Sequence, residues 1–285
     1  MNDEQVHWKI LGQTTVDIAP AKALDYHTDY DSGDSHSSLE LFRESPAKYA
    51  AIRVFRAMQG DPPTSAMKVG QALHALLLEY DKPCQFVFSP TRKKASAPPI
   101  WNSTAAAVGE TIGLSKSEMQ QLSGMFLAIA NEPDAWNLLV EQRGFNENVW
   151  PVIEPERLQL LKCKPDRVLE NGLVVDLKTV DGAVDPLSWS RTLAKWGYHR
   201  QAAFYLDVLA LAGQKADSFV FVAVSKDPPH EIGIYLVDEE SIEQGRRENR
   251  ELLERLAACR RTGVWKHEWQ GKILSVGVPR WAIHK

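Results

Sequence analysis

Residues 161–178 decide the fold, and their sequence is Leu-Lys-Cys-Lys-Pro-Asp-Arg-Val-Leu-Glu-Asn-Gly-Leu-Val-Val-Asp-Leu-Lys. Two runs rich in apolar residues, at 167–169 and 173–175, flank the Glu-Asn-Gly sequence at 170–172. Asn-Gly between such runs indicates a hairpin, because both residues tolerate a positive φ. The stretch therefore predicts two antiparallel strands joined by a tight turn.

The length of this turn decides which side chains share a face of the hairpin. A three-residue loop, with Gly172 in the left-handed region, places Asp166 opposite Asp176. Side chains alternate along a strand, so Lys178 shares the face of Asp176, whereas Leu177 points to the other side. A two-residue loop would shift the register by one and move Asp166 to the opposite face. The predicted cluster of two carboxylates and a lysine therefore requires the longer turn.

The paired carboxylates of this hairpin suggest a cation site. Two adjacent carboxylates repel unless a cation lies between them. Oxygen ligands suit hard divalent ions, chiefly Mg²⁺ or Mn²⁺. A lysine beside such an ion can steady a hydroxide nucleophile or the charge that develops on a phosphate. A hairpin with solvent-exposed Asp and Lys is the alternative, and the local pattern alone leaves it open.

The same residues resemble a known nuclease motif. Asp166, followed ten residues later by the Asp-Leu-Lys-Thr sequence at 176–179, resembles the core of the PD-(D/E)XK nucleases. Asp stands where many members have Glu, as is common in the RecE branch. Four more segments resemble the RecE and RecB branch: the helix at 70–79 with its histidine, the Q-x-x-x-Y pattern at 201–205, Ser-Pro-Ala-Lys-Tyr at 45–49, and Pro-Arg-Trp at 279–281. The resemblance extends from about residue 26 to the C-terminus.

The resemblance implies a fold and a domain organisation. The expected fold is α/β (α+β), with a central mixed β-sheet flanked by helices around a PD-(D/E)XK (restriction-endonuclease-like) core. Residues 1–36 are polar and lack sustained periodicity, so we expect an N-terminal arm or lead-in there. Residues 37–285 are expected to form a single nuclease domain.

The resemblance also implies roles for particular residues. The implied catalytic residues are Asp166, Asp176, Lys178, Gln201 and Tyr205. The implied metal ligands are His74, Asp166, Asp176 and the backbone carbonyl of Leu177. Glu147 is a further candidate ligand on a strand expected at 146–152, although a solvent-facing glutamate on that strand is an equal alternative.

The function implied by the resemblance is that of a Mg²⁺-dependent exonuclease acting on double-stranded DNA ends, in which Mn²⁺ is expected to substitute. Digestion from 5′ to 3′ would leave 3′ single strands for a single-strand annealing protein in phage-type recombination. A ring-forming homo-oligomer is expected. Two alternatives stay open: a PD-(D/E)XK nuclease of repair or restriction type without 5′-end selectivity, and a catalytically silent DNA-binding module.

The overall charge is not typical of a DNA-binding protein, because the net charge is −4 and the pI is about 6.1. A nuclease needs only a local basic groove. Arg191, Lys195 and Arg200 are the predicted DNA contacts, and basic residues also cluster at 92–94, 246–247 and 260–261.

The cysteine count and the hydropathy of the sequence limit the cofactors and the cellular location that we expect for the protein. The three cysteines, Cys84, Cys163 and Cys259, cannot supply the four ligands that hold an iron-sulfur cluster in some RecB-like nucleases, so none is expected. No apolar run approaches the roughly 18 residues of a membrane span, and the N-terminus does not resemble a signal peptide. We therefore expect no membrane association and a cytoplasmic protein of a bacterium or a phage-infected host cell.

Periodicity and capping signals predict the remaining elements. Ser38 is predicted to cap a helix that ends at Arg43, and Ser115 with Glu118 forms a predicted capping box. The stripe formed by residues 189, 193, 196, 200 and 204 is predicted to be core, and the tryptophans at 265, 269 and 281 to pack the chain end down. Further helices are expected at 46–58, 65–80, 115–130, 133–140, 187–212 (one helix or a broken pair) and 239–262, and further strands near 86, at 158–162, 219–224 and 232–237.

Overall fold

A computed structural model of the chain describes residues 33–59, 64–79, 84–88 and 110–283. The basic segment at 92–94, almost all of the N-terminal arm and the side chain of Trp281 lie outside the described residues.

The helices of the described chain are α1 (His36–Glu44), α2 (Pro46–Tyr49), α3 (Ser65–Leu78), α5 (Lys116–Ala130), α6 (Pro133–Trp136), α7 (Pro186–Trp196), α8 (Tyr198–Leu211), α9 (Glu239–Thr262) and α10 (Arg280–Ile283), with π-helical turns η2 (Ala50–Val54) and η3 (Asn137–Glu141). The strands are β1 (Cys84–Phe88), β2 (Glu110–Leu114), β3 (Gly144–Asn146), β4 (Trp150–Glu154), β5 (Gln159–Cys163), β6 (Arg167–Leu169), β7 (Leu173–Val180), β8 (Ser218–Ser225) and β9 (Ile232–Leu236). The capping box predicted for α5 is present.

A five-stranded mixed sheet forms the centre of the molecule, in the order β3-β6-β7-β8-β9. β7 and β8 run parallel, and the other neighbours are antiparallel. The predicted mixed sheet is confirmed, although β4 and β5 form a separate two-stranded sheet, and Leu161 of β5 also forms a parallel bridge with Asp34. The parallel pair β1 and β2 was only half predicted, because the strand β2 was missed.

The β6–β7 hairpin has the longer turn. Arg167 pairs with Val175 and Val168 with Val174, as the three-residue loop requires. Gly172 has a φ of 95°, which a residue with a side chain rarely adopts. The register therefore continues to Asp166 opposite Asp176, and the two-residue alternative is excluded.

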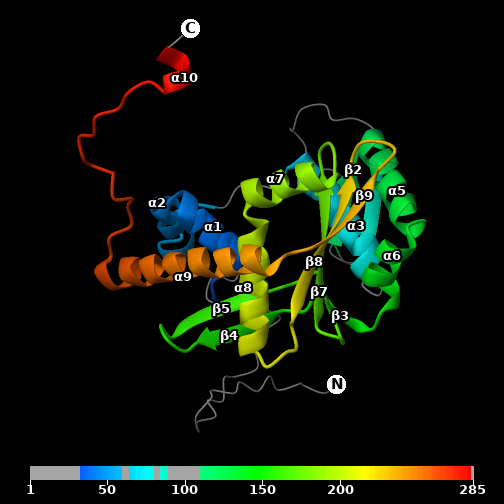
Figure 1. The fold of residues 1–285 in the computed structure, drawn as a ribbon, viewed down its shortest axis with the longest axis horizontal. Coiled ribbons are helices and arrows are strands. Elements are labelled where there is room, and N and C mark those ends of the chain that lie inside the picture. Colours follow the sequence, from blue (N-terminus) through cyan, green and yellow to red (C-terminus); the bar gives the residue numbers. More distant parts are fainter. Residues whose placement is uncertain (1–32, 60–63, 80–83, 89–109, 284–285) are drawn as a thin grey trace.

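Helices cover both faces of the sheet (Figure 1). Val175 and Leu177 of β7 pack with α3, α5 and α6 in one apolar cluster. Val174 packs with α8, α9 and α1 in the other cluster. This division follows from the alternation of side chains along β7, so the even-numbered residues of β7, including Asp176 and Lys178, face α8.

Two predicted local structures are wrong. The strand expected at 146–152 is interrupted, because Glu147 has a φ of 52° and separates β3 from β4. The helix α1 is capped by Ser35 rather than Ser38, and Ser38 instead completes the capping box as its third residue. Both errors concern the position of a boundary, which depends on single backbone angles more than on periodicity.

The helical region after the hairpin is a broken pair. Gly197 has a φ of 68° and ends α7, and a Cβ atom there would lie 1.9 Å from a guanidinium nitrogen of Arg200. Of the predicted apolar stripe, Trp189 is buried but Trp196 is 58% exposed. The break changes the direction of the chain, so the stripe does not continue on one face.

The C-terminal segment leaves the body after α9 and reaches α10 (Figure 1). Trp265 stacks on Tyr49 with ring centroids 5.7 Å apart, whereas Trp269 is 58% exposed. Beyond Gly271 several apolar side chains are exposed, among them Ile273 and Val276. Only the first part of the tail therefore packs as predicted. Within the described residues, we find no helix long and apolar enough to cross a bilayer.

Candidate active site

The two hairpin carboxylates are buried where β6 begins beside β7. Asp166 is 8% exposed and Asp176 is 1% exposed. One oxygen of Asp166, Oδ2, accepts the main-chain N–H of Leu177 at 2.7 Å. The Oδ1 atom of Asp176 accepts the side-chain amide of Gln201 at 2.7 Å, and its Oδ2 atom forms an ion pair with Lys178. The hairpin thus brings together the three charged residues that its register predicts.

His74 approaches from α3, on the face of the sheet opposite to α8. The helix comes close to β7 at Gly70, where a Cβ atom would lie 3.3 Å from the hydroxyl oxygen of Thr179. One turn later, Nε2 of His74 lies 3.0 Å from the carbonyl oxygen of Leu177. Its Nδ1 atom lies 3.4 Å from Oε1 of Glu147 and 3.5 Å from Oδ1 of Asp166. The predicted histidine and the Leu177 carbonyl therefore meet beside the carboxylates.

Glu147 lies in the bend between β3 and β4, and its side chain is 8% exposed. Its main-chain N–H donates to the carbonyl of Asp166 at 3.0 Å. Its Oε2 atom lies 2.6 Å from Nζ of Lys164. The solvent-facing alternative for this glutamate is wrong, because the bend directs the side chain into the cluster.

A divalent cation fits the three side chains His74, Glu147 and Asp166, which each offer one ligand atom within 4.8 Å of the others. Adjacent ligands of an octahedral Mg²⁺ shell lie about 3 Å apart, as follows from metal–oxygen distances of about 2.0–2.1 Å. The separations of 3.4 and 3.5 Å around His74 are close to this value. Asp176 lies outside this group of three; its Oδ1 accepts the Gln201 amide, whereas its buried Oδ2 forms only the ion pair with Lys178, and its role as a metal ligand stays a prediction.

The protonation of His74 and Asp166 reflects the crowding of negative charge. Burial alone would lower the pKa of His74, but the carboxylates of Asp166, Glu147 and Asp176 outweigh it and raise the pKa to about 9. Burial and the nearby charge of Asp176 raise the pKa of Asp166 to about 7. Without a metal, a proton on the imidazole therefore supplies part of the missing positive charge.

Lys178 lies over two aromatic rings. Its Nζ atom is 5.0 Å from the ring centroid of Tyr198 and 5.8 Å from that of Phe221. Burial alone would lower the pKa of Lys178, but Asp176 and Asp166 outweigh it and hold the pKa above its usual range. The ammonium group stays charged beside the carboxylates, where it can stabilise a negative phosphate oxygen.

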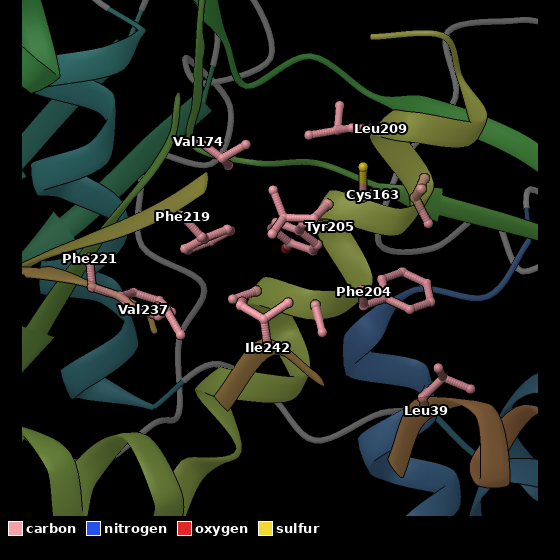
Figure 2. Packing of buried hydrophobic residues seen from close by; sticks show 14 of the residues in the cluster. Leu39, Cys163, Val174, Phe204, Tyr205, Leu209, Phe219, Phe221, Val237 and Ile242 are labelled. Atoms are coloured by element: carbon pink, nitrogen blue, oxygen red, sulfur yellow. The ribbon is translucent and has the colours of Figure 1, made fainter. Parts of the chain in front are cut away.

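Gln201 and Tyr205 lie on α8 in different surroundings. Gln201 bonds Asp176, so its amide positions a carboxylate of the site. The ring of Tyr205 lies in the apolar cluster, 6.2 Å from the ring of Phe219 (Figure 2). The structure brings Gln201 to the site as predicted and places the Tyr205 ring in the core beside it.

The predicted DNA contacts divide into two kinds. Arg191 and Lys195 are exposed on α7. Arg200 is buried and bonds Glu40 and Glu248. The prediction of Arg200 as a DNA contact is therefore wrong, because its guanidinium is held in an internal ion-pair network.

Two residues near the site were missed. Lys164 contacts Glu147, which lies 17 residues earlier in the chain, and no local pattern connects the two. Tyr198 stacks under Lys178, but its place depends on the break at Gly197. Lys164 could have been suspected, since it stands two residues before Asp166.

The fold and the site together define a PD-(D/E)XK domain. The sequence matches the model of the family described as "PDDEXK-like domain of unknown function (DUF3799)" over residues 35–272, and the chain belongs to this family. No match was found among curated proteins.

Solved structures support the fold. A protein from Eubacterium rectale, whose crystal structure is described as that of a "Putative exonuclease", is similar with a TM-score of 0.63 and 14% identity, over 93% of this chain and 98% of that chain. At this identity the likeness shows the fold alone. The structure of the protein SSO0001 is 16% identical over 65% of this chain and 86% of its own, with a TM-score of 0.27, which is too low to support an argument.

Proposed function

We propose that this protein is a divalent-metal-dependent DNA exonuclease that hydrolyses phosphodiester bonds of duplex DNA. The observation that supports the proposal is the buried group of His74, Glu147 and Asp166 beside Asp176 and Lys178, within a PD-(D/E)XK fold. Mg²⁺ is the proposed ion, and Mn²⁺ is expected to replace it. When bound, such an ion activates water and offsets charge on the phosphate oxygens.

Each residue has a defined part in this proposal. His74, Glu147 and Asp166 hold the ion, and the Leu177 carbonyl fixes the orientation of the histidine ring through the contact at 3.0 Å. Lys178 stabilises the negative charge on the reacting phosphate. Asp176 holds Lys178 in place and is itself oriented by Gln201. The buried Tyr205 supports α8 beneath Gln201.

The finer features of the proposal come from the resemblance to RecE-type exonucleases. They are digestion from 5′ to 3′, the production of 3′ single strands for an annealing protein in recombination, and assembly into a ring-forming homo-oligomer. The exposed Arg191 and Lys195 on α7 are the proposed contacts to the DNA backbone.

The test is the digestion of linear duplex DNA, labelled at its 5′ or its 3′ ends, and of covalently closed circular DNA. We expect linear DNA to be degraded with Mg²⁺ but not with EDTA, early release of the 5′ label, and intact circles. Cutting of closed circles would refute the exonuclease assignment and favour the repair or restriction alternative. Binding without any cutting would favour the silent DNA-binding module.

The matched variants are Asp176→Ala and Asp176→Asn. Either change is expected to reduce Mg²⁺-dependent degradation about 10²–10³-fold, since Lys178 loses its charged partner and the reacting phosphate loses an ordered cation. Thermal unfolding of both variants checks that the fold is retained. Undiminished activity in a folded variant would refute the site assignment.

A further inference from the structure

Each carboxylate of the proposed metal group has one oxygen turned to the group and the other held elsewhere. Oδ1 of Asp166 faces His74, whereas Oδ2 accepts the N–H of Leu177 at 2.7 Å. Oε1 of Glu147 faces the same histidine, whereas Oε2 lies 2.6 Å from Nζ of Lys164. The group therefore offers single oxygens rather than open carboxylates.

The position of Glu147 is fixed along the main chain as well as at its tip. Its φ of 52° is unusual for a residue with a side chain. The bend is secured by the N–H of Glu147, which bonds the Asp166 carbonyl at 3.0 Å, and by the amide of Asn146, which bonds the carbonyl of Leu78 at 3.0 Å. Because the backbone is fixed, the choice of partner at the carboxylate decides which oxygen is available.

Lys164 is suited to hold its oxygen permanently. Its side chain is 24% exposed and that of Glu147 is 8% exposed, so water competes poorly for the contact. At 2.6 Å the ammonium group of Lys164 is within hydrogen-bond distance of Oε2, so the second oxygen of Glu147 is occupied.

The number of oxygens that a carboxylate offers discriminates between divalent ions. Mg²⁺ requires six ligands in a near-octahedral arrangement, whereas Ca²⁺ takes six to eight oxygens and often binds carboxylates through both oxygens. A site that restricts each carboxylate to one oxygen therefore penalises Ca²⁺ more than Mg²⁺.

We propose that Lys164 is a specificity-determining residue of the metal site, which restricts Glu147 to a single ligand oxygen and so favours Mg²⁺ and Mn²⁺ over Ca²⁺. This inference rests on the proposed function, because it requires that the group of His74, Glu147 and Asp166 binds a divalent ion. Asp166 needs no such side chain, because the main chain of Leu177 already holds its second oxygen.

The test is metal binding to the DNA-free protein, measured by thermal shift in titrations with Mg²⁺, Mn²⁺ and Ca²⁺. The variant is Lys164→Met, which keeps an unbranched side chain one atom shorter and removes its charge. The matched control is Lys215→Met, at an exposed lysine that pairs with Asp217 at 3.5 Å. We expect the ratio of the Ca²⁺ and Mg²⁺ dissociation constants to fall about tenfold in Lys164→Met and to stay at the wild-type value in the control.

The Lys164→Arg variant retains a positive charge that can hold Oε2 and is expected to keep the wild-type ratio. If Lys164→Met does not fold, Lys164→Leu, which also carries no hydrogen-bond donor, serves in its place with the same expectation of a lower ratio. If the wild type binds metal and the ratio of the Ca²⁺ and Mg²⁺ dissociation constants is unchanged in Lys164→Met, the role of Lys164 is refuted and the proposed metal site is not. No thermal shift with any of the three ions in the wild type would refute the proposed metal site, and the inference with it.

Discussion

The buried cluster of charge around Asp34 and the one at the proposed active site are balanced in opposite ways. Asp34 is fully buried and accepts bonds from the hydroxyls of Tyr49 at 2.6 Å and Ser38 at 3.1 Å. Arg260 bonds its other oxygen at 2.6 Å, and Arg53 lies 3.6 Å away. One carboxylate therefore faces two guanidinium groups, and the cluster has an excess of positive charge.

The site cluster has the opposite balance. It contains the carboxylates of Glu147, Asp166 and Asp176 and only two lysines, with His74 as the remaining source of positive charge. Burial of paired charge is tolerated when the partners satisfy one another, whereas unpaired buried charge is costly. The difference separates a structural cluster, in which the buried carboxylate has its counter-charges within the chain, from one whose charge the proposed cation would balance.

The largest expected effect is a difference in the free energy of unfolding between two Asp→Asn substitutions, one in each cluster. Asp34→Asn leaves Arg53 and Arg260 without a counter-charge and should lower the free energy of unfolding by about 3–5 kcal/mol. Asp166→Asn relieves repulsion and retains an acceptor for the Leu177 N–H, so the stability of the metal-free protein should be unchanged or higher. Denaturant unfolding of both variants in EDTA measures the difference. Equal losses of stability in both would contradict the distinction between the clusters.

Lys178→Met tests the site cluster through its activity. The change removes the cation beside the reacting phosphate, and kcat should fall about 10²–10³-fold. The metal-binding group of His74, Glu147 and Asp166 is left intact, so the thermal shift produced by Mn²⁺ should persist. Loss of metal binding together with activity would show that Lys178 is needed for the metal group to form and would contradict its separate role at the phosphate.

Gln201→Leu tests the support of Asp176 from α8. The carboxylate loses the amide that bonds Oδ1, and activity should fall about 10–100-fold, as for residues that orient a catalytic group. Gln244→Leu, at an exposed glutamine of α9, is the control and should retain full activity. A Gln201 variant with normal activity would show that Lys178 alone positions Asp176.

The pH dependence of stability follows from the imbalance of the site cluster. The pKa of His74 is raised from 6.5 to about 9, so its contribution is complete below pH 6.5 and is lost as the pH rises through about 9. The pKa of Asp166 is raised from 3.8 to about 7, so its contribution is complete below pH 3.8 and is lost as the pH rises through about 7.

The metal-free protein should therefore lose about 3 kcal/mol of stability between pH 6.5 and pH 9. Mn²⁺ should reduce this loss, because the cation replaces the proton between the carboxylates. Melting curves across this range, with and without Mn²⁺, measure both effects. A metal-free protein that becomes more stable toward pH 9 would contradict the assigned pKa directions.

The sequence predicted the hairpin of the site better than it predicted the surroundings. Asn-Gly between apolar runs determined the turn, and the turn determined the register of Asp166 and Asp176, because all three are local in the chain. The contact of Glu147 with Lys164 depends on a left-handed residue in an expected strand, and propensity does not reveal such a residue.

The contacts of residues outside the hairpin could not be predicted from the sequence either. Arg200 was assigned to DNA because its partners, Glu40 and Glu248, are 160 and 48 residues distant in the chain. The Asp34 cluster was missed for the same reason, since it joins the start of α1 to the end of α9. Contacts between distant segments depend on packing, and a single sequence gives no direct sign of them.

The smallest expected effect completes the series of Asp→Asn substitutions. Asp217 pairs with Lys215 at 3.5 Å, and both side chains are about two-thirds exposed, at 65% and 63%. Water screens such a pair, so Asp217→Asn should change the free energy of unfolding by less than about 0.5 kcal/mol and leave activity intact. A large loss at this site would mean that charge removal alone destabilises the protein wherever it occurs. If Asp217→Asn leaves the free energy of unfolding almost unchanged, the loss of stability in Asp34→Asn is caused by the buried arginines that remain without a counter-charge. The retained stability of Asp166→Asn is then caused by the excess of negative charge around that residue.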